Sequence, residues 1–64
     1  MLGNKYRFTF TNPLAARAYM REWLGQCNIN IAQTIVDGYI DMYSYNPERL
    51  AEKFGGATYE IINA

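Results

Sequence analysis

The chain has 64 residues, half of them hydrophobic, and its six basic residues balance six acidic ones. With one cysteine and no histidine, it can form no disulfide within the chain and lacks the usual ligand set of a zinc site. Chains this small usually gain stability from such links, from unusually good packing or from a partner, so packing or a partner is expected here. With zero net charge, the chain lacks the excess of basic residues that is typical of nucleic-acid-binding proteins.

We expect a single domain over residues 1–64, without a cofactor and without membrane contact. No apolar run approaches the roughly 20 residues of a membrane-spanning helix, and residues 1–4 show neither a secretory signal nor a myristoylation start. The chain also has no Asn-X-Ser/Thr site, and Cys27 has no second cysteine to pair with. These features favour a reducing compartment, and we predict a cytoplasmic protein.

A strand-like segment followed by Asn-Pro, a short helix-like segment and glycine occurs twice in the chain. The first copy contains Asn12 and Pro13, and the second contains Asn46 and Pro47. Asparagine is a strong N-cap acceptor, and proline at the first helical position loses no needed donor and fixes φ. The repeat therefore predicts two helices, one beginning at Pro13 and one at Pro47.

Residues 5–11 alternate between aromatic and polar side chains, which is typical of a half-buried strand. The helix that follows is expected to run from Pro13 to about Leu24, with Gly25 as a left-handed C-terminal cap. Apolar side chains recur along it at helical spacing and predict the stripe that faces the core. This stripe consists of Ala16, Tyr19, Met20, Trp23 and Leu24.

Residues 29–36 and 39–45 are two further predicted strands, joined by Asp37-Gly38. Asp-Gly between apolar runs is a strong hairpin signal, because a type I′ turn needs positive φ at both central residues. Directly paired residues share a face, so the isoleucines of the first strand are expected on the core side with Ile40 and Met42 of the second. Val36 is expected on the opposite side with the tyrosines.

A helix from Pro47 to Phe54 and a last strand over residues 57–62 complete the order β-α-β-β-α-β. Each βαβ half needs a right-handed crossover, which places both helices on one face of the sheet. The chain therefore resembles a ferredoxin-like fold of the α+β class, with a four-stranded antiparallel sheet of order 4-1-3-2. A three-stranded sheet with residues 57–64 loose is the competing interpretation.

In the ferredoxin-like arrangement the first and third strands are parallel neighbours, which places Arg7 beside Asp41 and predicts an ion pair. The sheet face opposite the helices is expected to be bare. The candidate partner-binding residues share this face and are Arg7, Thr9, Val36, Tyr39, Asp41, Tyr43 and Tyr45.

The three tyrosines on this face have two interpretations. Tyrosine is a good strand former and is tolerated in half-exposed sheets, which needs no binding role. Three adjacent tyrosines also approach the size of the largest patch on a typical soluble monomer, and Tyr and Arg are enriched in interface hot spots. The pattern therefore favours protein contact, including self-association through the sheet.

Aromatic residues on the open face of a four-stranded sheet also resemble the base-stacking surface of RRM domains. The resemblance is partial, because Arg7 and Thr9 stand where an RRM would carry an aromatic residue and no RNP1-type Gly-Phe pattern is present. Zero net charge also weakens the phosphate contribution to affinity. Binding of single-stranded nucleic acid is therefore the alternative function.

Arg17 and Arg21 lie one turn apart on the first predicted helix and form a secondary candidate site for an acidic partner, although a solvated helix face is the commoner explanation. Catalysis has little support, because a chain without histidine cannot form the Ser-His or Cys-His nucleophile pairs. Cys27 is expected to be a packing residue. Gly55-Gly56 follows a helix, whereas a phosphate-binding loop precedes one.

We therefore expect a small non-enzymatic interaction module that binds with its open sheet face, with a free sheet edge, or with both. Residues 29–36 form the predicted free edge, which contains neither lysine nor proline. The expected partner is another protein, such as a host or cognate enzyme, or a second copy of the chain. Small phage inhibitors of host enzymes offer an analogy, in which binding occludes the enzyme, tyrosines act as anchors and charges set the register.

Overall fold

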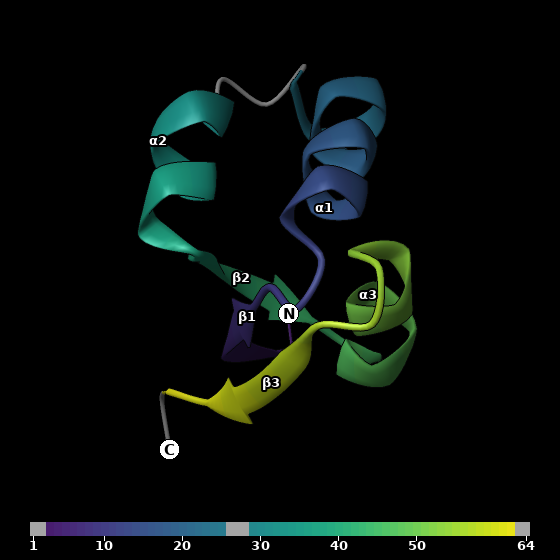
Figure 1. The fold of residues 1–64 in the computed structure, drawn as a ribbon. Coiled ribbons are helices and arrows are strands. Elements are labelled where there is room, and N and C mark those ends of the chain that lie inside the picture. Colours follow the sequence, from purple (N-terminus) through teal and green to yellow (C-terminus); the bar gives the residue numbers. More distant parts are fainter. Residues whose placement is uncertain (1–2, 26–28, 63–64) are drawn as a thin grey trace.

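The computed structural model describes residues 3–25 and 29–62, and Cys27 lies outside these ranges. The elements that it describes are strands and helices that follow one another in chain order (Figure 1). They are β1 (Asn4–Thr9), α1 (Pro13–Tyr19), the short π-helix η1 (Met20–Leu24), α2 (Ile31–Asp37), β2 (Tyr39–Ser44), α3 (Pro47–Lys53) and β3 (Thr58–Ile61).

Strand β1 lies at the centre of a three-stranded sheet of order β2-β1-β3, and both neighbours run antiparallel to it. Phe8 lies opposite Ile40 of β2 and Tyr59 of β3. Because directly opposed residues share a face, these three side chains point to one side of the sheet. The residues before and after them in each strand point to the other side.

The expected ferredoxin-like arrangement is wrong. The described residues form three α-helices and a three-stranded sheet in the order β-α-α-β-α-β, with η1 continuing α1. Residues 29–36, expected to form an edge strand, instead contribute to α2, so the four-stranded order 4-1-3-2 cannot form. The segments that carry Arg7 and Asp41 are neighbours as expected, but they run antiparallel. The competing interpretation is wrong as well, because residues 58–61 pair with β1.

Helix α2 forms because its two ends are capped by local hydrogen bonds. The side-chain oxygen of Asn30 accepts from the backbone N–H of Gln33 at 3.0 Å, which satisfies a free donor of the first turn. At the other end Gly38 adopts a left-handed conformation, with φ of 84°, and its N–H donates to the carbonyl of Thr34. The Asp-Gly pair therefore ends a helix rather than forming a hairpin turn.

The Asn-Pro repeat is confirmed by nearly identical caps at the starts of α1 and α3. Asn12 has φ of −132° and ψ of 86°, and Asn46 has φ of −135° and ψ of 81°. Each asparagine side chain accepts from a backbone N–H three residues later, at Ala15 and Arg49. Both helices therefore begin where the sequence predicts.

The helix that begins at Pro13 changes its winding at Met20, and this changes which side chains face the core. Residues 20–24 are π-helical, and the N–H of Gly25 donates to the carbonyl of Met20 five residues earlier. Each residue of such a turn rotates by less than in an α-helix, so Trp23 leaves the predicted apolar stripe and is 63% exposed. Gly25 is right-handed, with φ of −57°, and is not the expected left-handed cap.

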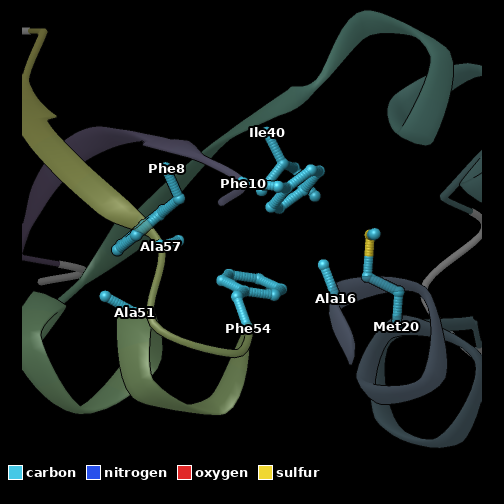
Figure 2. Packing of buried hydrophobic residues seen from close by; sticks show 8 residues of the cluster. All are labelled: Phe8, Phe10, Ala16, Met20, Ile40, Ala51, Phe54 and Ala57. Carbon is cyan, nitrogen blue, oxygen red and sulfur yellow. The ribbon is translucent and has the colours of Figure 1, made fainter. Parts of the chain in front are cut away.

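The core lies between the Phe8 face of the sheet and all three α-helices (Figure 2). Phe54 at the end of α3 is fully buried at its centre, with ring centroids 5.6 Å from Phe8, 5.5 Å from Phe10 and 5.2 Å from Tyr19. Residues of α1, η1 and α2 pack against the same cluster. The helices thus cover one face of the sheet and leave the side chains of the other face outside the core.

Close packing between α1 and the turn after α3 depends on Gly55. This residue has φ of +84°, and a Cβ atom added to it would lie 2.6 Å from the Cβ of Ala15. Side chains are therefore excluded from position 55 both by backbone conformation and by contact. The glycine lets the end of α3 approach α1 closely enough for Phe54 to reach its neighbours.

Candidate interaction face

The face of the sheet that points away from the helices is defined by the strand registers, and we call it the open face. The residue pairs of β1 with β2 and with β3 place alternate side chains of all three strands on it. Its members are Lys5, Arg7 and Thr9 of β1, Tyr39, Asp41 and Tyr43 of β2, and Thr58, Glu60 and Ile62 in and just after β3.

Arg7 lies near the centre of the open face and is held by Asp41 on the neighbouring strand. Its Nε donates to Oδ1 of Asp41 at 2.9 Å, and its Nη2 donates to Oδ2 at 3.1 Å. This two-pronged geometry matches the planar guanidinium to the planar carboxylate. The side chains are 40% and 28% exposed, respectively, so the predicted ion pair is present and stays in contact with solvent.

The tyrosines of β2 lie against the cations of β1. The guanidinium carbon of Arg7 lies 4.3 Å from the ring centroid of Tyr39, and Nζ of Lys5 lies 5.7 Å from that of Tyr43. Both distances are within the range of cation–π attraction. Tyr39 is 38% exposed and Tyr43 is 48% exposed, so each ring has one side on the protein and another available for contact.

The ion pair also shifts the pKa values of its two groups. The hydrogen bonds from Arg7 lower the pKa of Asp41; desolvation opposes them, and the charges of Arg7 and Lys5 add to the lowering. The hydrogen bonds to Asp41 raise the pKa of Arg7. Both groups are therefore charged at neutral pH, and the open face presents a fixed positive and a fixed negative charge side by side.

The structure brings five of the nine predicted binding residues together in the paired strands of the open face, and the other four lie outside these strands. Those on the face are Arg7, Thr9, Tyr39, Asp41 and Tyr43. Val36 is largely exposed but belongs to α2 and not to the sheet, because the predicted hairpin does not form. Tyr45 lies just past the end of β2 and is also largely exposed.

Arg17 and Arg21 lie on α1 and η1, whose buried residues Ala16 and Met20 pack against the opposite side of the sheet. Both arginines are exposed. They are therefore separate from the open face, as expected for a secondary site on the first helix.

Two features of the surface were absent from the predicted site. Lys5 belongs to the open face, and the alternation of residues 5–11 already places it beside Arg7. The second feature is a shallow hollow of about 250 Å³ between α3 and the end of α1 with η1, lined by Tyr19, Trp23 and Lys53. No sequence pattern indicates it, because it depends on the π-helical turn that moves Trp23 to the surface.

The open face has the chemistry of a contact surface. It combines aromatic rings with two cations and two carboxylates, and one cation, Arg7, is already paired with Asp41 by two hydrogen bonds. Within residues 3–25 and 29–62, no group of three or more Cys, Asp or Glu side chains lies close enough to hold a metal ion. None of the helices in the described part of the chain has the length and apolar character needed to cross a bilayer.

No protein-family model, curated protein or solved structure matched this chain.

Proposed function

We propose that this chain is a small non-enzymatic module that binds a partner protein with its open face. The observation that carries the proposal is the placement of Arg7, which is fixed between Asp41 and Tyr39 on the side of the sheet opposite the helix-covered core. Arginine and tyrosine are the residue types most enriched in interface hot spots. An arginine already held in one conformation loses less side-chain entropy on binding than a free one.

The charges of the open face favour a protein over a nucleic acid. Lys5 and Arg7 are balanced by Asp41 and Glu60, so the face lacks the excess of cations that phosphate contacts require. A surface of mixed charge instead specifies the register of a partner that carries the complementary pattern. Binding through this face would act by steric occlusion, as an inhibitor or an accessory subunit of an enzyme does.

Affinity capture from lysate of the native cells, with two matched double variants, tests the proposal. Tyr39→Ser with Tyr43→Ser removes two exposed rings from the open face, and Leu14→Ser with Val36→Ser removes two exposed apolar side chains from α1 and α2. We expect the wild type and the helix variant to retain the same protein, and the open-face variant to lose it.

Equal retention by all three chains would move the binding surface away from the open face. Retention of nucleic acid that weakens as salt rises would instead indicate the alternative function. Sedimentation of the wild type at twice the monomer mass, with the open-face variant at the monomer mass, would identify a second copy as the partner.

A further inference from the structure

Strand β3 presents its outer backbone edge without a partner in the described part of the chain. The N–H of Ile62 donates to the carbonyl of Lys5 at 3.0 Å, so Lys5 and Ile62 are a hydrogen-bonded pair of the β1–β3 ladder. In an antiparallel pair the backbone groups of alternate residues point to the partner strand. Those of Thr58 and Glu60 therefore point to β1, whereas those of Tyr59 and Ile61 point outward.

The side chains of these outward-pointing residues are apolar and are incompletely covered. Tyr59 and Ile61 lie on the helix-bearing face of the sheet, yet they are 43% and 51% exposed. The Tyr59 ring lies with its centroid 6.0 Å from those of Tyr6 and Phe8, so it continues the aromatic cluster of the core toward solvent. In Figure 1, β3 lies at the margin of the fold.

The opposite edge of the sheet, on β2, differs from β3 in how its side chains are covered and in how its charge is paired. On β2 the side chains on the helix-bearing face are covered, since Ile40 is buried and Met42 packs against the core. On its other face β2 carries Asp41, which is bound to Arg7, and the half-exposed rings of Tyr39 and Tyr43, which already contact Arg7 and Lys5. On the helix-bearing face, an added strand would therefore bury new apolar surface beside β3 but little beside β2.

We propose that the outer edge of β3 accepts an extended segment of a partner protein as a fourth strand, and that this segment has the sequence pattern apolar–basic–apolar. The backbone of the segment pairs with Tyr59 and Ile61, as in other cases of strand addition. Its apolar side chains cover the rings and methyl groups on the helix-bearing face, and its basic side chain lies on the open face opposite Glu60.

The charge of Glu60 selects this occupant over a second copy of the chain. Glu60 forms no ion pair within the described ranges, and Arg7, which lies opposite it in β1, is bound to Asp41. In the two-fold register that places Tyr59 against Ile61 of a second copy, the two Glu60 carboxylates would face each other directly. Like charges directly opposite destabilise a strand pair, and opposite charges stabilise it.

Titration of the isotope-labelled full chain with short peptides, followed by NMR, tests the proposal. The probes are acetyl-Thr-Val-Lys-Val-Thr-amide and the same peptide with glutamate in place of lysine. We expect saturable shifts of the Tyr59 and Ile61 amide signals, with the lysine peptide binding about fivefold more tightly than the glutamate peptide. Glu60→Lys should reverse this preference.

Two further variants separate backbone pairing from other modes of binding. Ile61→Pro removes an outward N–H, which an edge strand tolerates, and it should abolish binding of the lysine peptide. Tyr39→Ser with Tyr43→Ser should leave binding unchanged, because both tyrosines lie on β2, at the opposite edge of the sheet from β3. If Ile61→Pro does not fold, the reversal by Glu60→Lys decides.

Equal binding of the two peptides, or shifts confined to the open face or the helices, would overturn the proposal. A concentration-dependent dimer that broadens the Tyr59 and Ile61 signals without peptide would also overturn it, since the occupant would then be a second copy.

Discussion

The two faces of the sheet are built from the same strands and differ in what covers them. On one face Phe8 and Ile40 are buried beneath the helices, and on the other Arg7, Tyr39 and Asp41 meet solvent. Because a strand alternates its side chains between faces, neighbouring residues in β1 serve different purposes. Stability is therefore expected to depend on the helix-bearing face and recognition on the open face. Substitutions on one face should have little effect on the property that depends on the other.

Phe54→Ala should have the largest effect on stability. It removes the ring that contacts Phe8, Phe10 and Tyr19, and such truncations cost about 3–5 kcal/mol. Domains are stable by about 0.05–0.15 kcal/mol per residue, or about 3–10 kcal/mol for a chain of this length. We expect urea unfolding, followed by circular dichroism, to show a loss of about 3–5 kcal/mol for the variant, whereas Leu14→Ala, at an exposed position of α1, should unfold within about 0.5 kcal/mol of the wild type. A loss for Phe54→Ala as small as that for Leu14→Ala would place the stabilising core elsewhere.

Gly55→Ala should be the next most damaging change. It places a methyl group 2.6 Å from the Cβ of Ala15 and forces alanine to a φ of +84°, and the backbone cost alone is about 1–3 kcal/mol. Gly56→Ala is the matched control, since its φ is +87° but no atom lies within 4 Å of the added Cβ. The difference between the two unfolding free energies in urea measures the contact of α1 with the end of α3. Equal losses would mean that this contact contributes nothing.

The features that the sequence predicts correctly are those that depend on residues close together in the chain. The asparagine caps at Asn12 and Asn46 form because their hydrogen bonds reach only three residues along the chain. The alternation of β1 and of β2 places Arg7, Asp41, Tyr39 and Tyr43 on one face, and this result needs only that these two strands pair in this register. The open face was therefore largely predictable although the topology was wrong.

The segment that became α2 was ambiguous for physical reasons. Ile31 and Ile35 lie on one side of a strand and also one turn apart on a helix, and both pack against the core. β-branched residues and Asp37-Gly38 favour a hairpin, but glycine ends helices as readily as it forms turns. The signal that could have decided is Asn30 followed three residues later by Gln33, a helix-start pattern. The π-turn that exposes Trp23 has no such local signal.

Removing the tyrosines should separate recognition from stability. Tyr39→Ser with Tyr43→Ser deletes two half-exposed rings that contact Arg7 and Lys5, and cross-strand pairs of this kind contribute about 0.2–1 kcal/mol each. We expect a folded protein with a small loss in urea unfolding and complete loss of partner capture. Unfolding of this variant at the midpoint of Gly55→Ala would show that the open face carries part of the stability, and the comparison of the two faces would fail.

The smallest expected effect is the pH dependence that Asp41 confers. Its pKa in the folded protein is lowered, chiefly by the hydrogen bonds from Arg7, relative to about 3.9 in an unfolded chain. The ionised carboxylate therefore stabilises the fold above the unfolded pKa, and this contribution is lost as pH falls through the lower folded pKa. Asp41→Asn removes the titrating group, so the wild type should be the more stable at pH 7 and the gap should close as the pH falls below about 4. Urea unfolding of both chains from pH 7 to pH 2 measures the gap. A difference in unfolding free energy that stays constant with pH would mean that the charge of Asp41 does not stabilise the fold. Any role of that charge would then lie in recognition.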